Sequence, residues 1–271
     1  MHDIYFFTDI HGARPLFDAI MNFCKIQDPE ATIIYGGDAC DRGSDGYNIM
    51  KELLNNPKVL YLKGNHEDMF TKAARELKAL FSFDTTDKER IQKVLNACKH
   101  FDYKYASIQD SLYNGGIETL TNWILDGMPM DIVERLEHLP LTFQYENLDF
   151  CHSAPLYKFF KEIYDKEYNH QVIKSWDQEV ILWSRNTIDS PWKEGRKLIF
   201  GHTPVSYLSD FIRLPGAEPT GPVALPQKID MDTGACFTNK AYVLNVITMK
   251  AQGFLYNKET KTVEEIDCIQ F

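Results

Sequence analysis

The residues best suited to chemistry are densest in one short stretch, Gly36–Gly43. It places two carboxylates and a guanidinium, on Asp38, Asp41 and Arg42, between glycines and directly after the apolar run Thr32–Tyr35. Carboxylates bind divalent cations, and the N–H fork of arginine matches the oxygens of a phosphate. An Asp and an Arg this close together after a strand therefore indicate a site for metal and phosphate rather than a core.

Four other short stretches carry His, Asp or Asn at the equivalent place, immediately after an apolar run. With Asp38, the candidate metal ligands are Asp9, His11, Asn65, His152 and His202. This mixed oxygen and nitrogen donor set suits Mn²⁺, Fe or Zn²⁺. Six ligands are too many for one tetrahedral ion, but they fit two ions roughly 3.5–4 Å apart that share a carboxylate. Asp38 follows the middle one of the first three apolar runs, so we predict that its carboxylate is the one shared by both ions.

The elements before these stretches must bring them together. Ile4–Phe7, Thr32–Tyr35 and Val59–Leu62 are apolar runs typical of strands, and segments with apolar residues at helical spacing lie between them. A β-α-β-α-β order predicts parallel strands joined by right-handed crossovers. The binding crevice of such a sheet lies at the carboxyl ends of its strands. We therefore expect the polar residues that follow all three runs to share one edge.

The remainder of the chain predicts a helical insertion and then more strands. Residues 67–139 are mostly helical in pattern, and we interpret them as a helical cap inserted in a single domain of residues 1–271. Glu67 and Asp68 are expected to do no more than begin this cap, where acidic side chains favour the helix dipole. Strands are expected again at residues 148–151, 197–200, 242–247, 253–256 and 263–266. The proline-rich stretch Leu214–Pro226 predicts a mobile or substrate-facing loop.

Composition and charge exclude several classes of protein. The 271 residues are 44% hydrophobic and carry a formal net charge of −10, which repels nucleic-acid backbones, so no nucleic-acid binding is expected. No apolar run is long enough for a signal peptide or a membrane span. The six cysteines are scattered without a C-x-x-C pair, as in reduced proteins. We expect a cytoplasmic protein that does not bind membranes. Cys40 and Cys151 flank the site, and we interpret both as small buried side chains that fill space in the core. The alternative is that their oxidation controls activity.

Three N-terminal motifs resemble a known family. Asp9-Ile10-His11-Gly12, Gly37-Asp38-Ala39-Cys40-Asp41-Arg42-Gly43 and Gly64-Asn65-His66-Glu67 are similar to the motifs of the calcineurin-like metallophosphoesterase superfamily. The Asp-Arg-Gly ending and Glu67 resemble its phosphoprotein phosphatase branch, which includes bacterial and lambda-phage-type Ser/Thr protein phosphatases and symmetrical diadenosine tetraphosphate hydrolases. The resemblance implies an α/β fold, a β-sandwich with a β-α-β-α-β core flanked by helices.

Further motifs are similar to bacterial and phage members of that branch. They are Asn114-Gly115-Gly116, Trp183-Ser184-Arg185 and Asp232-Thr233-Gly234-Ala235, in which Asp232 is interpreted as a turn-forming residue. Two positions depart from the family pattern. Thr8 stands where glycine is usual, and His152-Ser153-Ala154-Pro155 replaces a His-Gly-Gly or His-Ala-Gly sequence. Neither departure removes a ligand, but the second changes the floor beside the metal and leaves the preferred leaving group open.

The resemblance also implies a role for each site residue. One ion is held by Asp9, His11 and Asp38, and the second by Asp38, Asn65, His152 and His202. His66 is the general acid, oriented by Asp41. Arg42, Arg185 and Asn65 bind the phosphate, and a water bridging the two ions attacks it in line.

The predicted function is therefore that of a phosphate monoesterase with two divalent ions, Mn²⁺ first and Fe or Zn²⁺ as alternatives. The expected partner is a phosphorylated protein or a small phosphoester, and the expected class is a Ser/Thr protein phosphatase, with phosphotyrosine left open as a further substrate. A dinucleoside tetraphosphate hydrolase is the first alternative. An inactive phosphate-binding module is the second, and the retention of every ligand, of His66 and of both arginines argues against it.

Overall fold

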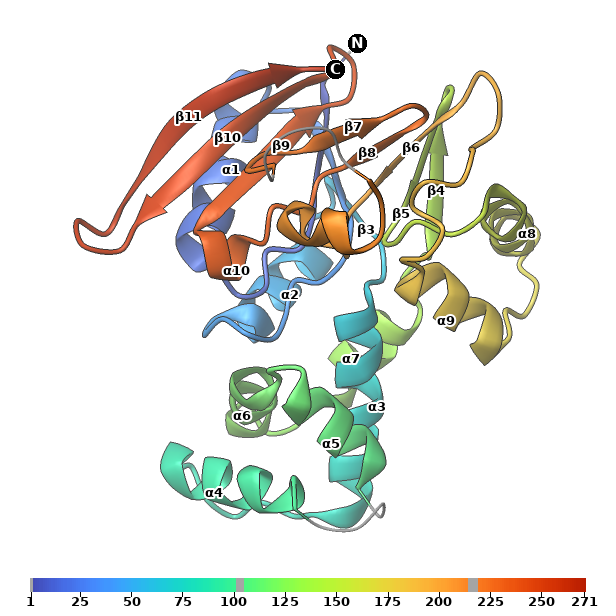
Figure 1. The fold of residues 1–271 in the computed structure, drawn as a ribbon. Coiled ribbons are helices and arrows are strands. Elements are labelled where there is room, and N and C mark those ends of the chain that lie inside the picture. The colour runs from blue at the N-terminus through green and yellow to red at the C-terminus, as the bar shows by residue number, and fades with distance from the viewer. Residues whose placement is uncertain (1, 101–104, 214–218) are drawn as a thin grey trace.

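The computed structural model describes residues 2–100, 105–213 and 219–271. Two mixed β-sheets form the body of the protein (Figure 1). The first has the strand order β11 (Thr262–Gln270), β10 (Lys250–Asn257), β9 (Lys240–Asn245), β1 (Ile4–Phe7), β2 (Thr32–Tyr35) and β3 (Val59–Tyr61). The second has the order β4 (Thr142–Tyr145), β5 (Leu148–Cys151), β6 (Lys197–Phe200), β8 (Lys228–Asp230) and β7 (Val223–Leu225).

Each sheet contains three adjacent parallel strands, and this parallel pairing positions the site. β1 pairs in parallel with β2, and β2 with β3, so that Phe7 lies opposite Tyr35 and Tyr35 opposite Tyr61. β5, β6 and β8 are likewise parallel, whereas β9 runs antiparallel to β1. The loops that follow β1, β2 and β3 therefore leave from one edge of the first sheet, as predicted.

The two sheets pack face to face. Phe6 and Ile34 of the first sheet share a buried cluster with Phe150 and Ile199 of the second, and the rings of Phe6 and Phe150 lie 5.5 Å apart. Neighbouring residues along a strand point to opposite faces. Phe7, next to Phe6, therefore packs on the outer side with the helices.

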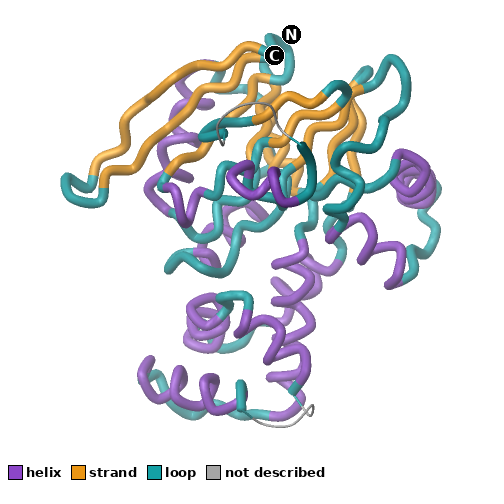
Figure 2. Tube along the Cα trace, viewed as in Figure 1, coloured by secondary structure: helices purple, strands orange, loops and turns teal. Residues whose placement is uncertain are grey.

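Helices cover both outer faces, which gives the order helix, sheet, sheet, helix. On the first sheet these are α1 (Arg14–Gln27) and α2 (Gly46–Asn55). On the second they are α8 (Tyr157–Tyr168) and α9 (Ser175–Trp183), where Phe160 and Ile181 pack against Phe200. This arrangement confirms the predicted α/β sandwich flanked by helices (Figure 2).

Five further helices extend away from the sheets (Figure 1). They are α3 (Asn65–Leu80), α4 (Lys88–Cys98), α5 (Ala106–Tyr113), α6 (Ile117–Leu125) and α7 (Met130–Glu137). Phe70 of α3 and Trp123 of α6 lie in the same continuous apolar cluster as the helices on the first sheet. Asp126 accepts hydrogen bonds from Tyr47 Oη (2.6 Å) and Lys51 Nζ (2.7 Å) of α2, which ties this helical region to the body.

Several elements in the second half of the chain were not predicted. α8 and α9 were missed, although apolar residues recur at helical spacing at Phe160 and Ile163. β7 lies inside the predicted loop Leu214–Pro226, so that prediction was wrong for residues 223–225, and residues 214–218 of it lie outside the described part. β8 holds the buried charges of Lys228 and Asp230, which hide its strand character. The short helices η1 (Val205–Asp210) and α10 (Ala235–Thr238) complete the structure.

None of the helices within the described residues is both long enough and apolar enough to cross a membrane. All six cysteines are free thiols.

Candidate metal centre

The backbone adopts left-handed conformations after β1, β2 and β6, where these strands lead into their site residues. Asp9, Asp38 and His202 have positive φ angles of 54°, 60° and 71°, and His11 and Asp41 also lie in the left-handed region. Non-glycine residues there cost on the order of 1–3 kcal/mol, so such backbone persists only where surrounding contacts fix it. Here those contacts include hydrogen bonds from Asp9 N to the Gly37 carbonyl and from His11 N to the Asp38 carbonyl, both 3.0 Å.

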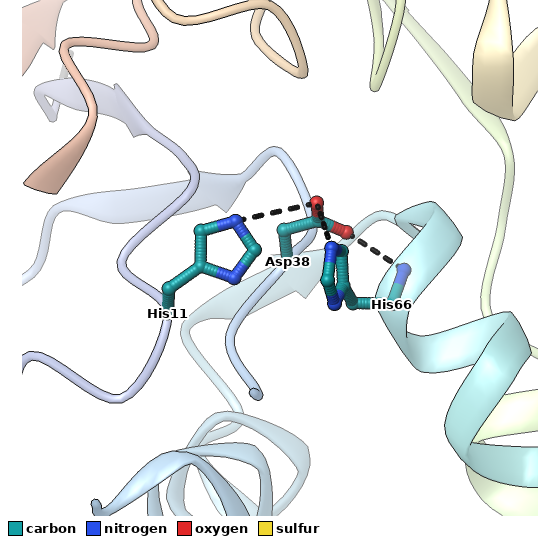
Figure 3. Close-up of side chains that lie close together, drawn as sticks. All are labelled: His11, Asp38 and His66. Atoms are coloured by element: carbon teal, nitrogen blue, oxygen red, sulfur yellow. Dashed lines mark hydrogen bonds and ion pairs between the residues drawn. The ribbon is translucent and has the colours of Figure 1, made fainter. Parts of the chain in front are cut away.

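The first group able to hold a cation consists of His11, Asp38 and His66 (Figure 3). The Oδ2 atom of Asp38 lies 3.6 Å from His11 Nε2 and 3.8 Å from His66 Nε2, while its Oδ1 accepts a hydrogen bond from His66 N at 3.0 Å. His11 Nδ1 lies 2.8 Å from the Cys40 carbonyl, which can only accept. Nδ1 therefore carries the proton, and Nε2 presents a lone pair to the centre.

The second group consists of Asp38, His152 and His202. His152 Nδ1 donates to the Gly36 carbonyl at 2.9 Å, and its Nε2 lies 3.4 Å from Asp38 Oδ2. Asn65 joins the two imidazoles, since its Oδ1 is 2.8 Å from His152 Nε2 and 2.9 Å from His202 Nδ1. Both groups share the Asp38 carboxylate.

Two buried polar atoms in the centre lack a partner in the described part of the chain, and a bound cation could supply it. Asp9 Oδ1 and His202 Nε2 are buried and have no hydrogen-bond partner among the described residues. An unsatisfied buried polar atom is costly, so each such atom calls for a ligand. The other oxygen of Asp9 is already engaged, by Thr8 Oγ1 at 2.6 Å and His202 N at 3.1 Å. Carboxylate, imidazole and amide donors around these atoms fit a divalent ion of the Mn²⁺, Fe or Zn²⁺ type.

Burial sets the electrostatics of the centre. Burial by itself raises the pKa of Asp38, but the imidazoles of His152 and His66 outweigh it and hold that pKa well below its usual range. Burial lowers the pKa of His152, but the Asp38 and Asp9 carboxylates overcome it and raise the pKa to about 10. Burial raises the pKa of Asp9 to about 6. The carboxylates thus attract positive charge strongly, and a cation would compete with the His152 proton.

Glu67 is a site residue that the sequence interpretation missed. It was expected only to begin the helix, yet its buried carboxylate accepts four hydrogen bonds of 2.8 Å. They come from the backbone N–H groups of Asp38, Ala39 and Gly64 and from Tyr61 Oη. Glu67 therefore fixes the loop that carries Asp38. A Glu three residues after the helix cap is the capping-box position, a signal that was available.

The helical region supports the Asp41 and Arg42 part of the site. Asp41 N donates to Thr119 Oγ1 at 2.9 Å, and Arg42 N donates to the Gly115 carbonyl at 3.0 Å. Asp41 Oδ2 in turn lies 2.7 Å from His66 Nδ1. Gly115 has a φ of 94°, and a Cβ there would lie 3.0 Å from Arg42 Cγ, so glycine at this position lets the turn after α5 approach the Arg42 loop closely.

Arg42 lies beside the first group of ligands. Its side chain is exposed, with Nη1 in contact with His11 Nε2 and Nη2 3.0 Å from His66 Nε2. Its guanidinium also lies over the ring of Phe237, 5.5 Å from the centroid. Arg42 thus links the metal-capable group to the protein surface.

Arg185 enters from the side of the second sheet. Its Nη2 donates to the His202 carbonyl at 3.1 Å, while its Nε is buried and unpaired within the described part of the chain. The loop that carries it is held by Lys228, a buried lysine whose Nζ donates to the Thr187 carbonyl at 2.7 Å. Asp232 Oδ1 accepts from Gly234 N at 2.8 Å, which confirms the predicted turn.

The structure therefore brings all the predicted site residues together. Around Asp38 lie the other candidate ligands and the neighbouring polar residues: Asp9, His11, Asn65, His152, His202, His66, Asp41, Arg42 and Arg185. Cys40 and Cys151 are fully buried, and burial raises the pKa of both thiols well above their usual value. Because the thiolate is the reactive form, this supports the interpretation as fillers.

Comparison with known proteins defines the class. The family model of the calcineurin-like phosphoesterases matches residues 2–220, so the chain belongs to this family of metal-dependent hydrolases. The fold resembles that of a protein serine/threonine phosphatase from Saccharomyces cerevisiae, with 14% identity and a TM-score of 0.50 over 100% of this chain and 81% of that one. No curated protein matches the sequence.

Two further solved structures are similar in fold. A cold-active protein tyrosine phosphatase has 14% identity and a TM-score of 0.51, over 98% of this chain and 79% of that chain. A protein provisionally assigned as a diadenosine tetraphosphatase has 14% identity and a TM-score of 0.48, over 98% of this chain and 93% of that chain. At such identities the likeness concerns the fold alone.

Proposed function

We propose that the protein is a phosphoprotein phosphatase that removes phosphate from serine and threonine with the help of two divalent ions. The observation that carries the proposal is the coupling of three features around Asp38. These are two sets of candidate ligands that share Asp38, a His66 that is held by Asp41 and kept for proton transfer, and two arginines at the rim. A metal site alone would bind a cation. Ester hydrolysis also needs a proton donor, which His66 would supply, and groups that bind the phosphate, which the arginines would supply.

The ligands divide between two positions that share Asp38. Asp9 and His11 would hold one ion with Asp38, and Asn65, His152 and His202 would hold the other. When bound, the two ions neutralise charge on the phosphate and activate the attacking water. The oxygen and nitrogen donors support Mn²⁺, with Fe and Zn²⁺ as alternatives.

Arg42 and Arg185 would bind the phosphate oxygens from opposite sides of the centre. Each arginine offers a fork of N–H donors that stabilises the charge on those oxygens in the transition state. Arg42 Nη1 contacts His11 Nε2 and its Nη2 lies 3.0 Å from His66 Nε2, the nitrogens that the metal and proton roles require. Its guanidinium must therefore turn from the imidazoles toward the phosphate when substrate binds, and its exposure gives it the room.

His66 would give a proton to the leaving oxygen. The carboxylate of Asp41 accepts from Nδ1, which leaves Nε2 as the nitrogen that exchanges its proton with the substrate. Burial lowers the pKa of His66, but the charges of Asp38 and Asp41 outweigh it, so the pKa is raised above its usual value. A raised pKa favours the protonated form that a general acid requires near neutral pH.

The test is a panel of substrates measured side by side on the metal-loaded protein. A phosphoserine peptide, diadenosine tetraphosphate and a 2′,3′-cyclic nucleotide are each assayed with Mn²⁺, Fe²⁺ and Zn²⁺. The proposal expects the highest kcat/KM for the phosphopeptide with Mn²⁺. Preferred cleavage of diadenosine tetraphosphate would replace it by the dinucleotide hydrolase, and no turnover of any substrate would favour the inactive binding module.

A further inference from the structure

The hydroxyl of Ser153 closes the end of the helix that leads into Arg185. The last four carbonyl groups of a helix have no partner within it, and α9 ends two residues before Arg185. One of these carbonyls, on Ile181, accepts a hydrogen bond of 2.8 Å from Ser153 Oγ. The same Oγ accepts a hydrogen bond of 3.1 Å from Ser184 N, the first backbone N–H after the helix. Ser153 therefore fixes the residue from which Arg185 departs.

The segment that supplies this hydroxyl also carries a candidate metal ligand. His152 directly precedes Ser153, and its imidazole belongs to the second group of ligands. Ser153 is fully buried, at 0% exposed, where a hydroxyl needs partners from the protein. It finds both partners at the end of α9. One buried side chain thus joins the ligand side of the centre to the loop of a candidate phosphate-binding arginine.

Two further hydrogen bonds bracket Arg185 along the chain. Ala154 N donates to the Ser184 carbonyl at 3.3 Å, and Thr187 Oγ1 donates to the Ala154 carbonyl at 2.6 Å. Residues 153 and 154 are therefore bonded to the residue before Arg185 and to the second residue after it. A shift of the Arg185 backbone relative to His152 would stretch these bonds.

The guanidinium of Arg185 depends on this backbone for its position. Its Nη2 donates to the His202 carbonyl at 3.1 Å, while its Nε has no hydrogen-bond partner among the described residues. A long side chain with a free donor keeps its place mainly through its backbone, because its own rotamers cost entropy to fix. Lys228 holds the loop at the Thr187 carbonyl, and residues 153 and 154 hold it next to the centre.

The hydroxyl at position 153 is also a departure of this chain from the pattern that its motifs resemble. That pattern has glycine or alanine directly after the metal-binding histidine. Neither residue has a side-chain group that could accept from Ser184 N or donate to the Ile181 carbonyl. The link between the two sides of the centre is therefore specific to the sequence His152-Ser153-Ala154.

We propose that Ser153 is a positioning residue that holds Arg185 in register with His152, so that the guanidinium is preset to bind phosphate beside the second ion. This inference rests on the proposed function and names a residue on which its phosphate site depends. Ser153 acts through the backbone of Arg185, because both hydrogen bonds of its hydroxyl go to the end of α9. A donor that is already in place loses less conformational freedom on binding, so its hydrogen bonds contribute more to affinity.

The test is a double-mutant cycle on the affinity of the Mn²⁺-loaded protein for inorganic phosphate, measured by calorimetry. Ser153→Ala is expected to weaken phosphate binding about 3- to 10-fold, the factor expected from one lost hydrogen bond. In an Arg185→Met background the same change should have an effect of less than about 2-fold, because the guanidinium that Ser153 positions is gone. Mn²⁺ affinity should also change less than about 2-fold, since His152 keeps its own hydrogen bonds.

Ser184→Ala is the matched control at the same helix end. It removes a hydroxyl that donates to the Val180 carbonyl at 2.6 Å, but it keeps the backbone bonds of Ser184 to residues 153 and 154. Phosphate affinity should therefore stay within about 2-fold of the wild type. Thr187→Val removes the other side-chain bond to this segment, so it should weaken phosphate binding as Ser153→Ala does, and again only where Arg185 is present.

The outcomes separate this inference from the proposed function. Equal losses of phosphate affinity with and without the Arg185 guanidinium would overturn the positioning role. A loss of Mn²⁺ affinity as large as the loss of phosphate affinity would also overturn it, because Ser153 would then act through His152. So would wild-type phosphate affinity in both Ser153→Ala and Thr187→Val, and each of these results leaves the phosphatase intact. If Arg185→Met binds phosphate as tightly as the wild type, the phosphate role of Arg185 in the proposed function fails, and this inference fails with it.

Discussion

The two sheets contribute unequal halves to the candidate centre. The half that follows β1, β2 and β3 is braced by side chains of the helical region, with Glu67 fixing the backbone of Asp38 and Thr119 that of Asp41, although Asp9 Oδ1 and Asp41 Oδ1 have no hydrogen-bond partner among the described residues. The half that follows the second sheet leaves His202 Nε2 and Arg185 Nε buried without partners in the part of the chain that the structure describes. Both halves thus present unsatisfied buried atoms, and the first half adds side-chain braces from the helical region.

This difference separates two tasks. Unsatisfied buried atoms cost free energy in the free protein, and a ligand that binds them recovers it. The braces of the first half therefore fix the positions of Asp38 and Asp41, while the unsatisfied atoms of both halves depend on what binds. Changes in the first half should lose activity through misplaced groups. Changes in the second should act through ligand binding or through the stability of the supporting loop.

The largest effect is expected where the halves meet. Asp38→Asn should lower kcat/KM about 1,000-fold or more, because loss of a single electrostatic contact in other enzymes already costs about 10²–10³-fold and this one serves both groups of ligands. Chelation should abolish wild-type activity, and Mn²⁺ should restore it in the wild type but not in the variant. Kinetics and calorimetric Mn²⁺ titration measure both effects. Wild-type turnover that survives complete chelation would refute the two-metal proposal.

His66→Asn should separate chemistry from binding within the first half. We expect kcat on a phosphoserine peptide to fall about 10²–10⁴-fold, the usual contribution of a general acid. The loss on p-nitrophenyl phosphate should be much smaller, because its leaving group needs little protonation. The ratio of the two losses is the measurement. Equal losses on both substrates would contradict the role of His66 as acid.

Glu67→Gln should show how far the first half depends on the hydrogen bonds that the Glu67 carboxylate accepts from the loop of Asp38. The amide cannot accept four hydrogen bonds, so we expect Mn²⁺ affinity to fall about 10–100-fold, as for other residues that orient metal ligands. Glu167→Gln is the matched control, because Glu167 accepts from Leu141 N and Thr142 N away from the centre. Both variants should lose about 1–3 kcal/mol of unfolding free energy. Unchanged Mn²⁺ affinity in Glu67→Gln would show that Asp38 is held by other contacts.

The smallest expected effect is on the pH dependence of stability, and it comes from Lys228, which holds the loop of Arg185 in the second half. Burial lowers the pKa of Lys228 from its ordinary value of 10.5 to about 8. Between these values the unfolded chain binds more protons than the folded one, so wild-type stability should rise with pH, by at most about 1.4 kcal/mol per unit. Lys228→Met should lose this rise, whereas Lys158→Met, at an exposed position of α8, should keep it. Urea unfolding between pH 7.5 and 10 measures the difference, and parallel curves for Lys228→Met and wild type would refute the assignment.

The two halves also differ in how well the sequence predicts the positions of their site residues. Asp9, Asp38 and Asn65 follow apolar runs in a regular β-α-β-α-β order, so local periodicity was enough to place them on one edge. The position of Arg185 depends on α9 and on β8, whose buried Lys228 and Asp230 conceal a strand. That the Glu67 carboxylate reaches the backbone of Asp38 depends on how β2 and β3 pair, which residue types alone do not give.

The strand order has a consequence for how the chain is made on the ribosome. β1 lies between β2 and β9, so one of its edges has no partner until residues 240–245 have been synthesised. At roughly 5–20 residues per second this leaves an apolar strand edge open for on the order of ten seconds to a minute, a template for pairing with other chains. Shielding of nascent chains should therefore matter most for this first strand, the one that carries Asp9 to the centre.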